Sequence, residues 1–174
     1  MTNVFIVDTN IILNDSNAVF CLPNSEVIIP QTVVSELDKK RDFADNKTAA
    51  YNARVFCRKI RKLIKQTKSS TLKVGSSSIT LLPHNKEEIE EAISKLGLQP
   101  GKADSSIVAT AWLVNREKDK NVTLLTNDTN MFLTATALGI NVEDFEVNKE
   151  FQDVYAGVKT IQLPDTEIID KIYN

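Results

Sequence analysis

Short apolar runs rich in valine and isoleucine alternate with longer segments of helical character, and this order restricts the fold more than any other feature. The runs lie at 4–7, 27–29, 122–125 and 140–142. None shows clear polar–apolar alternation, which is typical of strands covered on both faces of a parallel sheet. Because helical segments separate the runs, right-handed crossovers should place helices on both faces. We therefore expect an α/β fold with a parallel sheet.

The helical segments differ in length and in the strength of their pattern. The longest, 46–68, repeats apolar residues at helical spacing from Ala49 to Leu63. The stretch 67–82 breaks the rhythm, because two apolar runs flank Gly75 and three serines, so we expect a small hairpin or a mobile insertion there. The predicted helices are 30–40, 46–68, 86–96, 103–116 and 130–138.

Length and composition indicate one ordinary globular domain. A chain of 174 residues can bury a core of its own, and 42% hydrophobic residues suit such a core. No apolar run approaches the length that crosses a bilayer, and the chain opens directly into a strand, without a basic leader. Cys21 and Cys57 lie far apart and lack metal-binding spacing. We expect two reduced thiols in a cytoplasmic protein, with no membrane segment.

Four carboxylates fall where a parallel sheet gathers its ligands. Asp8 directly follows the first strand, and Asp128 follows the strand at 122–125 with two residues between. Glu36 lies one to two turns into the helix after the second strand, and Asp104 lies in the first turn of its helix. Ligands of open parallel sheets bind outside the carboxyl ends of the strands. If the first strand and 122–125 are neighbours, Asp8 and Asp128 meet there.

Electrostatics suggests what such a cluster is for. Two carboxylates about 4 Å apart repel by about 4 kcal/mol at an effective dielectric near 20, so several would become protonated unless a cation neutralised them. Magnesium binds a few carboxylate oxygens and retains waters, and it can activate a water without a histidine base. The single histidine, His84, is expected on a surface loop. The acids predict a divalent cation site, with phosphate chemistry as its use.

Each acid also has an ordinary structural explanation. Asp8 could cap a loop, and Glu36 could be a solvated helix residue. Asp104 and Asp128 are common residue types at the start of a helix. Taken singly, these explanations are at least as good as a metal site. The coincidence of all four at one predicted edge favours the cation site.

Taken in chain order, the motifs around these acids resemble those of the PIN-domain nucleases over about residues 3–145. A longer stretch, LNDSNAVFCLPNSEVIIPQTVVSELDKKR, looks like the amino-terminal PIN domain of PhoH-like proteins, although Ser16 stands where that pattern usually has proline. Near the carboxyl end, VYAGVKTIQL is similar to the segment that leads into their ATPase domain. The motifs are DTN at 8–10, PQTVVSEL at 30–37, ADSSIVATA at 103–111 and TND at 126–128.

The resemblance implies a three-layer α/β/α fold around a central parallel, twisted sheet, and Mg²⁺- or Mn²⁺-dependent cleavage of single-stranded RNA. It implies that Asp8, Asp104 and Asp128 are metal ligands, and that Glu36 joins them as a fourth catalytic acid. Two further residues carry over as polar helpers that orient a carboxylate, a water or a phosphate: Asn10 and Thr126.

The resemblance also suggests a domain boundary and partners. Residues 1–145 correspond to the nuclease domain, and 146–174 to an extension that packs on it or leads to an ATPase domain. GLQPGK at 97–102 lacks the spacing of a P-loop, so the ATPase itself is expected to be absent. Expected partners are single-stranded RNA and a PhoH-like ATPase, in cis or in trans; a homo-oligomer is left open. The alternative function is a catalytically silent PIN fold that binds RNA or protein beside such an ATPase.

Charge is unevenly distributed, although the net charge is only −2. No acid occurs between Asp45 and Glu87, so the cations of the long helix lack acids at i±4. We interpret them as an RNA-binding face that contacts phosphates; the alternative is a solvated helix surface. Tyr51 and Phe43 could stack on bases, but we expect both in the core. The cations of this row are Arg54, Arg58, Arg61, Lys65 and Lys68.

Overall fold

The computed structural model describes residues 3–43, 46–81, 84–117 and 121–145. A six-stranded sheet lies at its centre, in the order β3-β4-β2-β1-β5-β6. β1 pairs in parallel with both β2 and β5, so the strands that precede Asp8 and Asp128 are neighbours. The strands are β1 (Asn3–Val7), β2 (Ser25–Ile29), β3 (Thr71–Val74), β4 (Ser77–Leu81), β5 (Val122–Leu125) and β6 (Asn141–Glu143).

The sheet is mostly parallel, as expected, and the antiparallel pair among the described strands is β3 with β4. β3 and β4 form the hairpin predicted in this stretch, with Gly75 in its turn at a φ of +57°, a conformation that glycine adopts at little cost. The hairpin is not an insertion, because β4 also pairs in parallel with β2. A sequence pattern can identify two arms of a hairpin, but it does not say which arm joins the central sheet.

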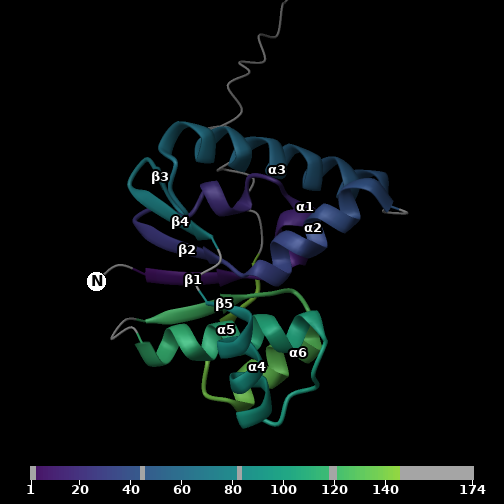
Figure 1. The fold of residues 1–174 in the computed structure, drawn as a ribbon, viewed down its shortest axis with the longest axis vertical. Helices are drawn as coiled ribbons and strands as arrows, with labels where there is room; N and C mark the ends of the chain where they lie inside the picture. Colours follow the sequence, from purple (N-terminus) through teal and green to yellow (C-terminus); the bar gives the residue numbers. More distant parts are fainter. Residues whose placement is uncertain (1–2, 44–45, 82–83, 118–120, 146–174) are drawn as a thin grey trace, which may run out of the picture.

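Helices cover both faces of the sheet, as expected. Figure 1 shows α1, α2 and α3 on one face and α4, α5 and α6 on the other. The sheet is therefore the middle of three layers. Five helices match predicted segments, whereas α1 and the 3₁₀ turn η1 were not expected. The helices are α1 (Thr9–Asn14), η1 (Ala18–Phe20), α2 (Gln31–Phe43), α3 (Lys47–Thr67), α4 (Lys86–Lys95), α5 (Ala103–Glu117) and α6 (Thr129–Ala137).

The α3 helix shows how its sequence produces its structure. Asn46 caps its amino terminus by accepting hydrogen bonds from the backbone N–H groups of Thr48 and Ala49. Its predicted apolar stripe, including Phe56 and Ile60, is buried against the sheet. The opposite side of the helix carries the cations and faces solvent. A Phe56→Ala substitution in such a core typically costs about 3–5 kcal/mol of stability.

α1 depends on its surroundings, since an isolated helix of six residues is unstable in water. Asn52, which is buried on α3, holds its carboxyl end. The Asn52 side-chain amide donates hydrogen bonds to the carbonyl oxygens of Leu13 at 2.8 Å and Asn14 at 3.0 Å. Because α1 starts beside Asp8, this contact helps to fix the carboxyl end of β1.

The strand order reverses direction at β1. The chain leaves β1 toward β2 along one face and later returns to β5, on the other side of β1, along the other face. Ligands of open α/β sheets bind at such a switch point.

Within the described ranges, no helix is long and apolar enough to cross a membrane. The predicted extension, 146–174, lies outside the described residues.

Candidate active site at the carboxyl edge of the sheet

Asp8 lies at the switch point and is only 3% exposed. It follows β1 directly and occupies the N-cap position of α1. Its backbone N–H donates a hydrogen bond to the Leu125 carbonyl oxygen at 3.0 Å, so the pairing of β1 with β5 continues one residue past the strand. The Asp8 carboxylate is therefore carried by a rigid part of the backbone.

Burial raises the pKa of Asp8 above its ordinary value of 3.8, and the charge of Asp104 acts in the same direction. The Thr126 hydroxyl donates a hydrogen bond to Asp8 Oδ2 at 2.9 Å and lowers the pKa, as do the backbone N–H groups of Thr9 and Asn10. These donors do not offset the burial. The folded chain therefore holds a carboxylate whose charged form is unfavourable, which a nearby cation would relieve.

Thr126 connects Asp8 to Asp128. Its side chain is fully buried, and its oxygen also accepts the backbone N–H of Asp128 at 3.0 Å. Asp128 Oδ1 accepts the Met131 N–H at 2.9 Å and caps α6. The cap explanation is thus correct for this residue. It leaves Asp128 Oδ2 without a hydrogen-bond partner among the described residues, so one oxygen of this half-buried carboxylate is available to a ligand.

Glu36 leans back toward the end of β1, as predicted. It lies in α2, is half-buried, and its Oε2 accepts a hydrogen bond from the Thr9 hydroxyl at 2.5 Å. Thr9 is 3% exposed and directly follows Asp8. We did not predict a role for Thr9, although it is the middle residue of the DTN motif. Its hydroxyl joins the start of α1 to α2 and thereby restricts where the Glu36 carboxylate can lie.

Asp104 and Asn10 are more exposed than the other predicted residues. Asp104 lies in the first turn of α5, as expected, and its charge acts on the pKa of Asp8. Asn10 is exposed on α1, and its side chain makes no hydrogen bond within the described ranges. Both are thus free to meet a ligand that approaches the sheet from solvent.

We refer to Asp8, Glu36, Asp104 and Asp128 as the acidic edge. Over the described parts of the chain, no three acidic, histidine or cysteine side chains already lie close enough together to hold a metal ion. None of the four acids forms an ion pair with a described lysine or arginine. The site thus offers oxygen donors and uncompensated negative charge. Such a set fits a hydrated Mg²⁺ or Mn²⁺, which needs only one or two direct carboxylates and keeps several waters.

A groove of about 520 Å³ borders Glu36, between α2, α4 and α5. Lys39 and Lys102 line it, as does His84.

The expectation of a surface histidine is wrong, since the His84 side chain is only 5% exposed and its Nε2 lies 3.2 Å from Glu117 Oε1. The preceding proline suggested a loop but carried no information about what covers the ring. His84 Nδ1 is buried without a partner among the described residues.

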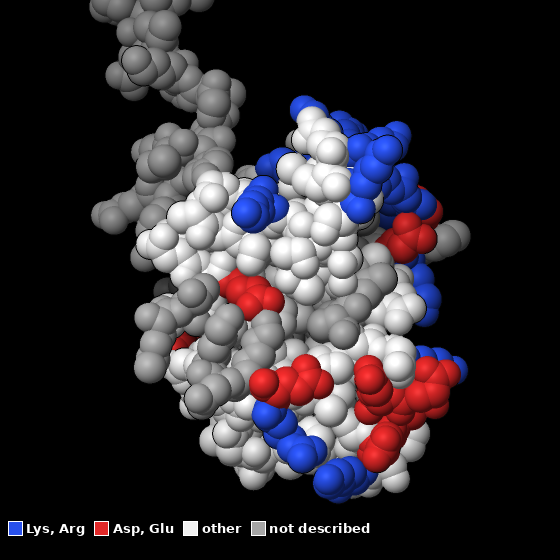
Figure 2. All heavy atoms as spheres, turned by 60° about the vertical axis from the view of Figure 1, so that its left-hand side comes forward, with Lys and Arg blue, Asp and Glu red and all other residues white. Residues whose placement is uncertain are grey.

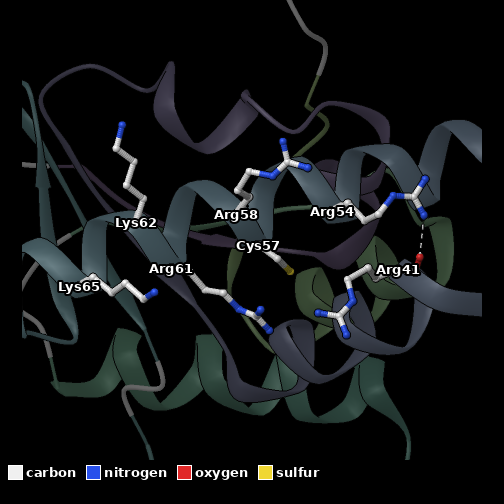
Figure 3. Close-up of a pocket in the computed structure, with 7 residues that line it drawn as sticks. All are labelled: Arg41, Arg54, Cys57, Arg58, Arg61, Lys62 and Lys65. Carbon is white, nitrogen blue, oxygen red and sulfur yellow. Dashed lines mark hydrogen bonds between the residues drawn. The ribbon is translucent and has the colours of Figure 1, made fainter.

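The predicted basic row lines a second hollow, of about 500 Å³, between α2 and α3. Figure 3 shows how Arg41 from α2 faces the row on α3. Lys68, at the end of α3, does not line it. Figure 2 shows Lys and Arg gathered at the top of the molecule, over α3, and Asp and Glu gathered lower on the same face. We call the hollow between α2 and α3 the basic hollow. Its residues are Arg41, Arg54, Cys57, Arg58, Arg61, Lys62 and Lys65.

Comparison with known proteins agrees with this architecture. A sequence profile described as "PIN domain" matches residues 5–146. Protein PhoH2 of Thermobispora bispora is 26% identical over 169 residues, which cover 96% of this chain and 37% of that protein. Protein PhoH2 of Bacillus subtilis is 27% identical over 175 residues, 94% of this chain and 38% of that protein. The chain thus spans less than two-fifths of the length of either relative.

One solved structure similar to this chain is the PIN domain of RRP44 from T. brucei. The likeness covers 99% of this chain and 90% of that chain, with a TM-score of 0.46 and 14% identity. A likeness of this size adds nothing to the assignment. The family profile, in contrast, covers well over half of the chain, and the two PhoH2 proteins are distant homologues. The chain belongs to the PIN domain family, whose members are typically metal-dependent nucleases.

Proposed function

We propose that this protein is a metal-dependent ribonuclease that hydrolyses phosphodiester bonds of single-stranded RNA at the acidic edge. The observation that carries the proposal is the state of Asp8, a buried carboxylate with a raised pKa and no cationic partner among the described residues. An unfavourable charge at a topological switch point is typical of a functional site. Family membership, together with the order of the four motifs, supports a nuclease over other uses of a cation.

We assign Asp8, Asp104 and Asp128 as the residues that would hold Mg²⁺ or Mn²⁺. Such an ion, when bound, supplies Lewis-acid polarisation of the phosphate and lowers the pKa of a coordinated water. The Asp8 carboxylate is oriented by Thr126, and Asp128 offers the oxygen that its cap leaves unused. Asp104 adds negative charge from the start of α5. Thr126 thus acts as a positioning residue for two of the three ligands.

We assign Glu36 and Asn10 to contacts with the attacking water and the RNA phosphate, and not to the metal ion. Thr9 holds one oxygen of Glu36, which leaves the other to accept a proton or a hydrogen bond from the attacking water. The exposed Asn10 amide can donate to a phosphate oxygen. The groove beside Glu36 suits the approaching strand, because Lys39 and Lys102 line it and can contact phosphates. The products expected from this chemistry in the family are a 5′-phosphate and a 3′-hydroxyl.

A cleavage assay tests the proposal. A labelled single-stranded RNA is incubated with Mg²⁺ or Mn²⁺ and with the wild-type protein, Asp8→Asn or Asp38→Asn. Asp38 is a matched control, since it lies on α2 near Glu36 but is exposed and pairs with Arg41 at 3.1 Å. We expect cleavage by wild type and Asp38→Asn, and at least a 100-fold slower rate for Asp8→Asn (order of magnitude from metal-site mutations). Equal rates for all three proteins would contradict the proposal.

A second candidate is a catalytically silent module that binds RNA or protein and works with a PhoH-like ATPase, in cis or in trans. Two observations favour it: the described residues hold no ready-made three-ligand cage, and the relatives named PhoH2 are more than twice as long as this chain. Calorimetry with Mn²⁺ separates the two functions. Binding at micromolar to millimolar levels that Asp8→Asn removes supports the nuclease, whereas no binding supports the silent module.

A further inference from the structure

The basic hollow lies between two helices and is separate from the groove that borders Glu36. Four of its α3 cations, Arg54, Arg58, Arg61 and Lys65, recur every three or four residues, and Lys62 lies beside Arg61 in the chain. The eleven residues from the first to the last correspond to about 16 Å of helix rise. Arg41 contributes from α2, thirteen residues before Arg54 in the chain. Arg54 Nη1 donates a hydrogen bond to the Arg41 carbonyl oxygen at 2.9 Å. This contact ties the two helices together at one end of the hollow.

Most cations in the hollow are uncompensated. Arg41 pairs with Asp38 at 3.1 Å and with Asp42 at 3.2 Å. Arg54 donates its side-chain hydrogen bond to the Arg41 carbonyl oxygen. The other four exposed cations form no ion pair or side-chain hydrogen bond with any described residue. Burial raises the pKa of the Cys57 thiol, so this residue adds no negative charge. The unpaired cations are Arg58, Arg61, Lys62 and Lys65.

Tyr51 extends the same face of α3. We expected it in the core, but its side chain is 61% exposed. At 100° per residue, Tyr51 lies about 20° around the helix from Arg58 and from Lys62. An exposed aromatic ring in line with unpaired cations has the composition of single-strand binding surfaces, in which bases stack on aromatic rings and cations follow the backbone.

We propose that the basic hollow and Tyr51 form a second binding site for single-stranded RNA, one that holds the strand outside the acidic edge. The cations contact successive phosphates, and Tyr51 stacks on an unpaired base. This inference rests on the proposed function only for the identity of the nucleic acid, since binding in the hollow requires neither the metal nor cleavage.

The connection to the acidic edge runs through α2. Glu36 and Arg41 lie on this one helix, five residues apart, which corresponds to about 7.5 Å of rise. They point in different directions, because five residues turn the helix by about 140°. A strand held at Arg41 is thus within a short distance of the groove beside Glu36 without competing for its residues. We expect the hollow to raise substrate affinity and to leave the chemical step unchanged.

Binding in EDTA tests the site apart from cleavage. Fluorescence anisotropy of a labelled 12-nucleotide single-stranded RNA is measured over a range of salt concentrations. For Arg58→Gln with Arg61→Gln, we expect affinity to fall by roughly 2- to 30-fold, the range for two exposed charge contacts. The slope of log K against log salt should become shallower by about 1.4, since each phosphate contact on a single strand contributes about 0.7.

Tyr51→Ala tests the stacking role. We expect affinity to fall by roughly 5- to 150-fold, the effect of losing one stacked base, with an unchanged salt slope. Tyr51→Phe keeps the ring and should bind like wild type. The matched charge control is Lys95→Gln with Arg116→Gln, on α4 and α5. It removes the same charge outside both the hollow and the groove beside Glu36 and should have little effect.

Several outcomes would overturn the proposal. The first two are wild-type affinity and salt slope for the Arg58→Gln, Arg61→Gln variant, and an equal loss of affinity for the Lys95→Gln, Arg116→Gln control. The other two are binding of double-stranded RNA as tight as that of the single strand, and binding of a mononucleotide as tight as that of the oligonucleotide. The last result would assign the hollow to a small phosphate-bearing ligand instead. Asp8→Asn must bind normally in EDTA. If it binds but no protein cleaves, the nuclease proposal fails and the second site stands.

Discussion

The acidic edge and the basic hollow both gather like charges, but they hold them in opposite ways. At the acidic edge, Asp8 is buried and Thr126 fixes its orientation, while Thr9 restrains Glu36. In the hollow, Arg58, Arg61 and Lys65 are exposed and form no ion pair with a described residue. Chemistry at a phosphate requires precisely placed groups, whereas contacts to a flexible strand need only charge within reach. The difference indicates catalysis at the first region and binding at the second.

Removing the Thr126 hydroxyl should produce the largest contrast between the two regions. Thr126→Val keeps the shape of the side chain but leaves the Asp8 carboxylate and the Asp128 N–H without their partner. We expect kcat to fall by about 10–100-fold, as for other groups that orient metal ligands, with RNA binding in EDTA unchanged. Steady-state kinetics and anisotropy measure both. Thr126→Ser, which keeps the hydroxyl, is the control, and an equal loss in both variants would contradict the role of the hydroxyl.

The next effect concerns how the stability of the metal-free protein depends on pH. Because the pKa of Asp8 is raised in the folded state, the folded protein binds more protons than the unfolded chain between the ordinary pKa of 3.8 and the raised one. Its stability should therefore fall as pH rises through this window and remain lower above it. We expect metal-free Asp8→Asn to melt at a higher temperature than wild type at pH 7, and this gain to vanish below about pH 3.8.

With Mn²⁺ present, the wild-type protein should melt at a higher temperature than Asp8→Asn. An ion present at 100 times its Kd stabilises the folded wild-type protein by about 2.7 kcal/mol, and Asp8→Asn should gain much less. Thermal melts with and without Mn²⁺, at several pH values, measure both effects. A wild-type protein that is more stable than Asp8→Asn without metal at pH 7 would show that Asp8 carries no unfavourable charge.

Thr9→Val should have a smaller effect on catalysis. It frees Glu36 but leaves the Asp8–Thr126–Asp128 contacts intact. We expect kcat to fall by about tenfold or less, with little change in Mn²⁺ affinity, because Glu36 is assigned to the attacking water and not to the metal ion. Calorimetry together with single-turnover kinetics checks this separation. Loss of Mn²⁺ binding in Thr9→Val would place Glu36 among the metal ligands.

The smallest effect is expected on the free energy of unfolding when the arginines of the basic hollow are replaced. Arg58 and Arg61 are exposed and form no ion pair or side-chain hydrogen bond with a described residue. Replacing both by glutamine should therefore change stability by no more than about 0.5 kcal/mol per site. KM for RNA should rise while kcat is retained. Chemical denaturation and steady-state kinetics test this. A fall in kcat with unchanged KM would mean that the hollow takes part in the chemical step.

The individual elements were largely predictable from local pattern. The apolar runs located the central strands, and the apolar stripe through Phe56 located α3. α1 escaped prediction because six residues are too few to show helical periodicity, and because Asn52, distant in sequence, holds its end. The hairpin was recognised, but the parallel pairing of β4 with β2 was not.

In the candidate site, too, the residues could be predicted from local pattern, whereas the contacts between them could not. The motifs singled out the four acids, but the contacts made by Thr9 and Thr126 depend on which strands and helices become neighbours. Burial was less predictable. Tyr51 was expected in the core and is exposed, and His84 was expected on the surface, but its side chain is only 5% exposed. Local composition indicates how apolar a segment is, but not what packs over it.

The amino-acid sequence alone determined the α/β class, the family motifs, the four acids and the row of cations on one helix, because each follows from short-range spacing. Tertiary structure decided the rest. Pairing of β1 with β5 joined Asp8 to Asp128 through Thr126, burial raised the pKa of Asp8, and packing of α2 on α3 brought Arg41 to the basic row. These are long-range contacts, and their energies depend on distance and desolvation, which spacing along a chain does not specify.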